Sequence, residues 1–269
     1  MAVLQTNDGV QIYYQVKGEG KALLLLPGWT CSTRFFDKNA EALSRTCKVI
    51  LMDFRGHGQS EKVDHGHRIA RYAMDVKNLL DHLELEDVTA LGWSMGSAVL
   101  WSYLELFGKD RIRKLICVDQ APLQYTGPDW AWGQNGCYDV EMFIRLCADL
   151  KYAHKDCAVG TVYGCMHRQP TEDELQFLST EILNCPATVA IEIMRDHTNL
   201  DWRDFVKRID VPALVCVARQ SKVFDWQGSA WVGENIKGAK TVFFEESGHM
   251  LFWEEPDKFN QVVAEFVGN

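Results

Sequence analysis

Short runs of entirely apolar residues alternate along this chain with segments in which apolar residues repeat at intervals of three and four. A strand that is apolar on every residue is buried on both faces, as in parallel sheets with helices on each side. The strands that this pattern predicts cover residues 22–26, 49–52, 88–91, 115–118, 211–217 and 241–244. Residues 10–16 alternate between apolar and polar side chains and predict an edge strand in a hairpin. We therefore expect an α/β fold, a mostly parallel sheet covered by helices.

Helical spacing appears between these strands at 35–43, 69–83, 97–107 and 256–266. From about residue 125 to 198 the strand pattern stops, and further helices are predicted at 139–150, 171–183 and 186–195. The simplest architecture is a core domain of residues 1–124 and 201–269, with a helical cap at 125–200 inserted after the strand that ends at Asp119. Because open parallel sheets bind ligands at the carboxyl ends of their strands, we expect the cap to cover that edge.

The charge balance and the apolar runs exclude several kinds of partner. The 269 residues carry a formal net charge of −9, and no basic cluster suits nucleic acid or an anionic membrane. The longest aliphatic run, residues 23–26, is too short to span a bilayer, and the first ten residues show no secretory signal. We expect a cytoplasmic protein without a membrane span.

The cysteines and the glycine-rich segment give no sign of a cofactor. The nine cysteines include no C-x-x-C pair and lie in apolar runs, which favours buried free thiols over disulfides or zinc ligands. Residues 54–60 lack the spacing and the lysine of a phosphate-binding loop, so we interpret them as a scaffold turn in which His57 is structural. Neither a metal nor another cofactor is expected.

The segment Gly92-Trp93-Ser94-Met95-Gly96 fits the pattern G-x-S-x-G and lies between a predicted strand and a predicted helix. In that context the pattern predicts a nucleophile elbow, a sharp turn that exposes a serine hydroxyl above the sheet edge. The helix that follows supplies free N–H groups and positive potential at its N-terminus. Ser94 is therefore the candidate nucleophile.

A serine hydroxyl needs a base, and His249 is the candidate. It follows the last predicted strand in a short loop, Glu246-Ser247-Gly248-His249. Two carboxylates compete as the acid that orients the imidazole. Asp119 ends the strand 115–118, whereas Asp225 lies late in the loop after the strand 211–217. We favour Asp119 because of its position at the carboxyl edge, with Asp225 as the alternative.

An oxyanion hole needs two backbone N–H groups, and Met95 and Trp29 are positioned to supply them. Met95 follows the nucleophile, and Trp29 follows the strand end Pro27-Gly28. Aromatic side chains and methionines predicted near the site suit an apolar or aromatic small molecule. The pocket residues that we predict are Trp93, Trp130, Trp132, Trp226 and Met250.

These motifs, together with residues 53–60, resemble the α/β-hydrolase superfamily over nearly the whole chain. The resemblance implies Ser94 as nucleophile and His249 as base, in agreement with the reading of the residues themselves. An acid at Asp119 is similar to the branch that includes the cofactor-independent 2,4-dioxygenases of 3-hydroxy-4-quinolones. Those enzymes tend to have a histidine where this chain has Trp93, which favours hydrolysis here.

Three functions follow as hypotheses. The first is a serine hydrolase with a Ser-His-Asp triad that cleaves an ester, a lactone or an activated carbonyl of an apolar or aromatic small molecule. The second is a cofactor-free dioxygenase in which His249 and Asp119 deprotonate a 3-hydroxy-4-quinolone-type heteroaromatic. The third is a ligand receptor or signalling partner with a slow Ser-His pair, which would form a covalent adduct and release it very slowly.

Overall fold

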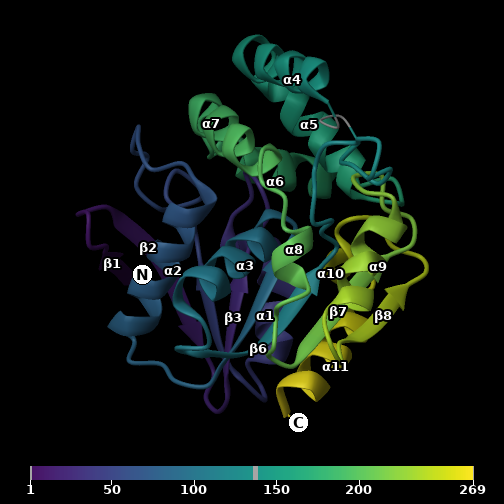
Figure 1. Cartoon of the computed structure of the whole chain (residues 1–269). Helices are drawn as coiled ribbons and strands as arrows, with labels where there is room; N and C mark the ends of the chain where they lie inside the picture. Colours follow the sequence, from purple (N-terminus) through teal and green to yellow (C-terminus); the bar gives the residue numbers. More distant parts are fainter. Residues whose placement is uncertain (1, 136–138, 269) are drawn as a thin grey trace.

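The computed structural model describes residues 2–135 and 139–268 and places an eight-stranded sheet at the centre of the chain (Figure 1). The strand order is β1-β2-β4-β3-β5-β6-β7-β8, and only the pairs that involve β2 are antiparallel. The strands are β1 (Ala2–Gln5), β2 (Gln11–Lys17), β3 (Ala22–Leu26), β4 (Lys48–Met52), β5 (Val88–Trp93), β6 (Ile112–Val118), β7 (Ala213–Ala218) and β8 (Lys240–Phe244). The predicted mostly parallel α/β fold is confirmed.

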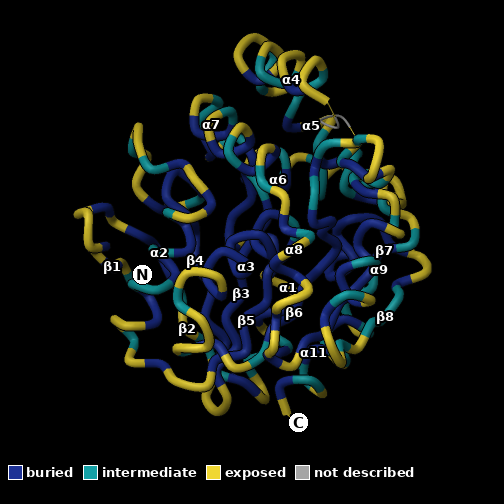
Figure 2. The backbone as a smooth tube through the Cα atoms, viewed as in Figure 1, coloured by how far each residue is buried: buried dark blue, intermediate teal, exposed yellow. Residues whose placement is uncertain are grey.

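Successive residues of the central strands contribute to opposite faces of the sheet, so the chain has a core on each side. On β3, Leu24 and Leu26 belong to one core, whereas Leu23 and Leu25 belong to the other. The first face is covered by α2 (Ile69–His82), α3 (Met95–Phe107), α8 (Arg203–Val206) and α9 (Trp226–Asn235). The second is covered by η1 (Thr33–Phe36), α1 (Asp37–Leu43), α10 (Leu251–Glu254) and α11 (Pro256–Gly268). Burial on both faces explains why these strands are continuously apolar (Figure 2).

Four helices between β6 and α8 form the cap: α4 (Val140–Tyr152), α5 (His154–Cys165), α6 (Glu172–Leu183) and α7 (Ala187–Thr198). Figure 1 shows these four helices gathered at one end of the molecule, above the carboxyl ends of the parallel strands. Thr171 opens α6 with a capping box in which its hydroxyl accepts from the N–H of Glu174, so the helix begins where the sequence pattern at 171–183 predicts it. The sequence pattern did not predict α5.

Within the described residues, no single helix is long and apolar enough to cross a membrane. By length and composition alone, α6 and α7 pass such a test only as a pair, which is bent by 81°. Buried residues on these helices, such as Leu178 and Ile193, pack into the two cores beside the sheet.

Candidate active site

Ser94 stands at a sharp turn between β5 and α3. Its backbone adopts φ 53° and ψ −126°, a conformation that non-glycine residues rarely adopt and that tends to mark functional positions. The neighbouring glycines make the turn possible. A Cβ on Gly92 would lie 2.3 Å from the carbonyl carbon of Gly96, and one on Gly96 would lie 2.6 Å from the oxygen of Leu26. The nucleophile-elbow geometry expected from the sequence is therefore present.

The loop after β3 passes directly over this turn. A Cβ on Gly28 would stand 3.3 Å from the Cβ of Ser94, a tight contact that would require the loop or the turn to shift by a few tenths of an ångström. The N–H of Trp29 donates to no acceptor among the described residues. Met95 is the first residue of α3, where an N–H has no acceptor within the helix. Two free donors therefore flank Ser94, as an oxyanion hole requires.

Asp119 and His249 form a buried pair at the ends of β6 and of the loop after β8. Asp119 Oδ2 lies 2.7 Å from His249 Nδ1, and the side chains are almost completely buried. The other carboxylate oxygen, Oδ1, accepts from the hydroxyl of Ser229 at 3.0 Å and from the N–H of Ala218 at 3.3 Å. Like Ser94, Asp119 has a positive φ, 44°. The carboxylate is thus fully engaged, and it fixes the orientation of the imidazole.

Asp225, the alternative acid, lies elsewhere. It is exposed at the N-terminus of α9, and no hydrogen bond joins it to His249. The loop after β7 carries it past the sheet edge before α9 begins. The geometry therefore favours Asp119 as the partner of His249.

The backbone of the His249 loop is held from two sides. The indole N–H of Trp93 donates to the carbonyl oxygen of His249 at 3.0 Å. Gly248 packs against the end of α5, where an added Cβ would lie 2.6 Å from the amide nitrogen of His167. This glycine is required for a close approach, because its φ lies outside the left-handed region. The two contacts join the histidine both to the elbow strand and to the cap.

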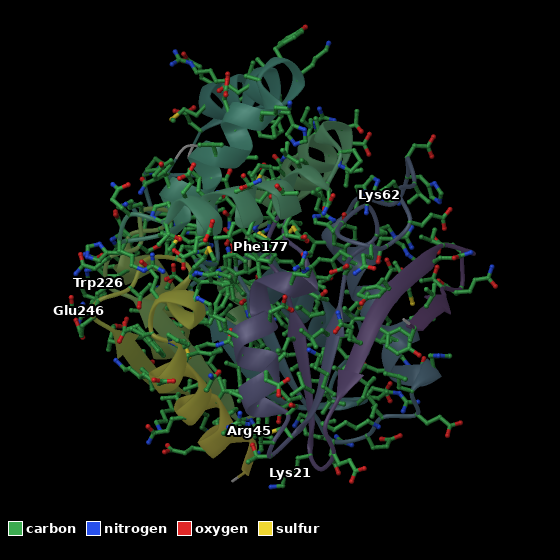
Figure 3. All side chains as sticks on the ribbon, turned by 180° about the vertical axis from the view of Figure 1, so that it is seen from behind. Lys21, Arg45, Lys62, Phe177, Trp226 and Glu246 are labelled. Carbon is green, nitrogen blue, oxygen red and sulfur yellow. The ribbon has the colours of Figure 1, made fainter. Side chains whose placement is uncertain are left out.

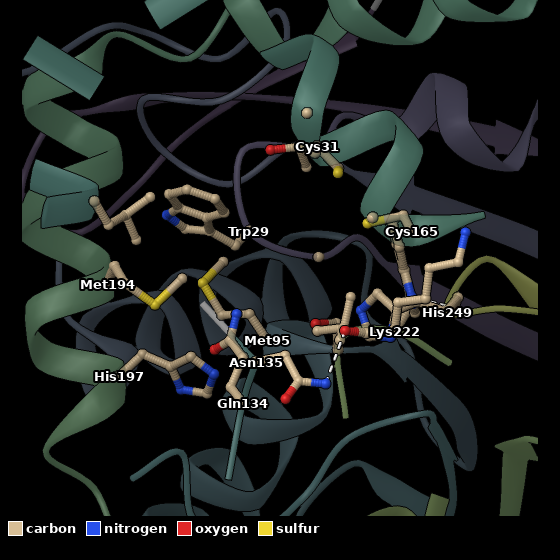
Figure 4. Close-up of a pocket in the computed structure, with 18 of the residues that line it drawn as sticks. Trp29, Cys31, Met95, Gln134, Asn135, Cys165, Met194, His197, Lys222 and His249 are labelled. Atoms are coloured by element: carbon tan, nitrogen blue, oxygen red, sulfur yellow. Dashed lines mark hydrogen bonds between the residues drawn. The ribbon is translucent and has the colours of Figure 1, made fainter. Parts of the chain in front are cut away.

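Ser94 and His249 line one cavity of about 270 Å³ between the sheet and the cap, which we call the Ser94 cavity. Its walls come from the β3 loop, the elbow, the cap helices α4, α5 and α7, and the loop after β7 (Figure 4). Trp29, Met95 and Trp93 also line it. The hydroxyl of Ser94 has no hydrogen-bond partner among the described residues. The candidate nucleophile and base thus meet at one cavity, and Asp119 lies buried behind His249.

The expectation that Trp130 and Trp132 line this cavity is wrong. Trp130 packs at right angles on Trp231 of α9, with 5.7 Å between ring centroids, and its indole donates to the oxygen of Leu123. Trp132 joins the same cluster. These rings line a separate surface cleft beside Arg203. The reason is that the chain after β6 folds back on α8 and α9 before it enters the cap.

Trp226 and Met250 do not line the Ser94 cavity either. Trp226 lies under the guanidinium of Arg219, 3.9 Å from the ring centroid, at the molecular edge where Figure 3 also places Glu246. Met250 is adjacent to His249 in sequence, but its side chain is buried in the core. Its N–H donates to the oxygen of Cys165. Of the five pocket residues predicted, only Trp93 lines the cavity.

Several lining residues escaped prediction from the sequence. Residues of α5 supply one wall, including Cys157, Gly160 and Gly164, and His197 of α7 supplies part of another. A signal for His197 does exist in the sequence. It continues the buried stripe of α7 that contains Ala190 and Ile193, where a polar residue is unexpected.

The cysteines of the cavity are protonated at neutral pH. Burial raises the pKa of Cys165 to about 12 and that of Cys31 well above its ordinary value. A thiol with such a pKa is a weak nucleophile. The eight cysteines among the described residues are free, as expected, although Cys147, Cys157 and Cys165 are only partly buried. The serine therefore remains the candidate nucleophile of the cavity.

Known proteins resemble this chain along nearly its full length. Residues 21–140 match the family model described as the alpha/beta hydrolase fold. The chain is 32% identical to the non-heme chloroperoxidase CPO-A1 of Kitasatospora aureofaciens, with 99% of each chain covered. It is 26% identical to an AB hydrolase superfamily protein of Bacillus subtilis, with 98% and 97% covered. Among solved structures, an esterase from Exiguobacterium antarcticum superposes with a TM-score of 0.93 at 25% identity and covers 100% of this chain and 99% of its own.

The TM-score of 0.93 over the full chain agrees with the fold described above. The family that the sequence motifs suggested is therefore shown. The chain belongs to the α/β-hydrolase superfamily.

Proposed function

We propose that this protein is a serine hydrolase that cleaves an ester, a lactone or an activated carbonyl of a compact, largely apolar molecule. The observation that carries the proposal is the 2.7 Å contact between Asp119 Oδ2 and His249 Nδ1 at the cavity that Ser94 also lines. This contact leaves Nε2 as the imidazole nitrogen available to the serine hydroxyl. A relative named as an AB hydrolase superfamily protein and an esterase of the same fold support the reaction class.

In the proposed reaction, His249 accepts the proton of the Ser94 hydroxyl while the serine oxygen attacks the substrate carbonyl carbon. The negative charge that develops on the carbonyl oxygen is stabilised by the N–H groups of Met95 and Trp29. The imidazolium, held by Asp119, then protonates the leaving alcohol. Water then attacks the acyl-enzyme carbonyl while His249 accepts a proton from it. The imidazolium returns that proton to the Ser94 oxygen as the acid is released.

A fluorophosphonate probe tests the nucleophile. We expect the probe to label Ser94 in the native protein, as measured by intact mass. The Ser94→Ala variant should take up no label, and the His249→Ala variant should be labelled far more slowly because the base is missing. Equal labelling of Ser94→Ala would show that another residue reacts and would contradict the proposal.

The Asp119–His249 pair also supports a second candidate, a cofactor-free oxygenase, because a proton-abstracting His-Asp dyad needs no nucleophilic serine. In that reaction His249 removes a hydroxyl proton from a 3-hydroxy-4-quinolone, and the electron-rich anion reacts directly with O2. The two candidates differ in one comparison. Ester hydrolysis should be lost in both Ser94→Ala and His249→Ala. Oxygen uptake that survives Ser94→Ala but disappears in His249→Ala would establish the oxygenase.

A further inference from the structure

A second histidine lies across the Ser94 cavity from His249. His197 projects into it from the last turn of α7, beside Met194 and below Trp29, whereas His249 and Lys222 lie on the other side (Figure 4). Only 3% of His197 is exposed, and its Nδ1 has no hydrogen-bond partner among the described residues. A buried polar nitrogen without a partner is destabilising and is uncommon in folded proteins.

Four of the other polar side chains of the cavity are already engaged with the protein, whereas the hydroxyl of Ser94 and the partly buried amide of Gln134 make no side-chain hydrogen bond with the described residues. The indole of Trp29 donates to the oxygen of Ala190, and the amide of Asn135 donates to the oxygen of Lys222. The hydroxyl of Thr161 donates to the oxygen of Cys157. The ammonium group of Lys222 donates to the oxygen of Met166. His197 therefore differs from these four residues, because it is buried at the cavity with a free nitrogen.

The state of the imidazole narrows what it can bind. Burial lowers the pKa of His197 to about 4, so the ring is neutral at pH 7. A neutral imidazole has one N–H donor and one acceptor nitrogen, which suits an uncharged hydroxyl or keto oxygen. A carboxylate or phosphate would need a cationic partner on this wall. The methionines beside the ring, Met95 and Met194, favour an otherwise apolar ligand.

We propose that His197 binds the substrate through a hydrogen bond to a hydroxyl or keto oxygen that is remote from the carbonyl attacked by Ser94. This inference rests on the proposed hydrolysis and adds a substrate class to it: esters or lactones with an apolar body and one neutral oxygen at the far end. A site built to hydrogen-bond such an oxygen discriminates strongly against the analogue that lacks it, because the protein group is then left unpaired.

Matched substrate pairs test the proposal. Each pair is an aryl or alkyl ester with and without one hydroxyl or keto group, placed in turn on the acyl part and on the alcohol part. The quantity measured is the ratio of kcat/KM for the oxygenated ester to kcat/KM for its plain partner, which cancels any general loss of activity. For the pair that fits, we expect this ratio to fall at least tenfold in His197→Leu. The His197→Asn variant, which keeps a donor and an acceptor, should recover part of it.

His154→Leu is the matched control. His154 is also a cap histidine with an unpartnered buried nitrogen, Nε2, but it does not line the Ser94 cavity. Its variant should keep the native ratio for every pair. A native ratio in His197→Leu for all pairs, or an equal loss for both members of each pair, overturns the role of His197. If His197→Leu does not fold, the comparison of His197→Asn with the native protein decides instead.

Failure of the proposed function gives a different result. In that case the native protein hydrolyses no ester and Ser94 takes up no fluorophosphonate. The same pairs are then titrated by tryptophan fluorescence, since Trp29 and Trp93 line the cavity. A tenfold loss of the Kd ratio in His197→Leu supports His197 as the binding residue even then, and an unchanged Kd ratio overturns it.

Discussion

The hydroxyl of Ser229 donates a 3.0 Å hydrogen bond to Oδ1 of Asp119, on the opposite side of the carboxylate from His249. Ser229 comes from α9, behind the site, and its side chain is completely buried. It does not line the Ser94 cavity. Ser229 can therefore affect the reaction only through Asp119, which makes it a positioning residue.

We expect Ser229→Ala to lower kcat about tenfold with little change in KM, because a hydrogen bond to a charged group contributes roughly 1.5–3 kcal/mol. Steady-state kinetics on one ester measures this split. Ser102→Ala is the matched control, since Ser102 is equally buried on α3 but makes no side-chain hydrogen bond with the described residues. Equal effects of the two substitutions would mean that the loss is structural.

Asp119→Asn should lower kcat by about 10⁴, because the asparagine amide cannot hold the imidazole in the tautomer that accepts the serine proton. Asp225→Asn should change kcat by less than about threefold, since a substitution of an exposed residue away from the site has small effects. Both variants are assayed with the same ester at saturating concentration. A larger loss in Asp225→Asn would move the acid to the later loop.

Gly164→Leu should narrow the Ser94 cavity without preventing folding. A Cβ on Gly164 meets no heavy atom within 4 Å, and Gly164 lines the cavity, so the added side chain has room to extend into it. We expect kcat/KM for a naphthyl ester to fall about tenfold or more relative to that for a methyl ester of the same acid, within the range that misfit in an apolar pocket produces. The ratio of the two rates measures the effect.

Gly96→Ala is the contrasting control. Its Cβ would lie 2.6 Å from the oxygen of Leu26, which is backbone and cannot move away easily. We expect this substitution to destabilise the protein by about 1–3 kcal/mol, as overpacking does, and to reduce the hydrolysis of both esters together. Thermal unfolding separates it from Gly164→Leu, which should keep a nearly native Tm.

The stability of the protein should fall in acid partly because of His197. Its pKa is about 4 in the folded protein and near 6.5 in the unfolded chain, so the unfolded chain binds the extra proton first. The stabilisation is fully present above pH 6.5 and is lost as the pH falls toward 4, with a total on the order of 3 kcal/mol. His197→Leu lacks this loss. The free energy of unfolding of the native protein minus that of the variant should therefore fall over that range in denaturant titrations, and a constant difference would contradict the assignment.

The sheet and the elbow could be predicted because their physical requirements appear locally in the sequence. Strands buried on both faces must be apolar throughout, and a turn as tight as that at Ser94 needs glycines at fixed positions. The choice of Asp119 over Asp225 also followed from strand position. Pairing with His249, however, joins residues 130 positions apart, which no local pattern reveals.

The cap was harder to predict because its helices meet a cavity as well as a core. The face of α5 toward the Ser94 cavity carries Cys157, Gly160, Thr161 and Gly164, so the apolar repeat that marks a helix is missing. The pocket positions of Trp130 and Trp132 were predicted wrongly for a related reason. Their residue type suits a ligand wall and a surface cluster equally well, and only the path of the chain after β6 decides between them.

Trp29 connects the cap helix α7 directly to the proposed oxyanion site. Its indole is bonded to the carbonyl of Ala190 in α7, while its backbone N–H is the donor that we assign to the oxyanion. A ligand that favours one position of α7 therefore favours one position of that N–H, and the dependence is reciprocal by thermodynamic linkage. We therefore expect substitutions on α7, far from the scissile bond, to change the affinity for the transition state. Contacts of the substrate with the cap would in this way affect the reaction at the carbonyl carbon.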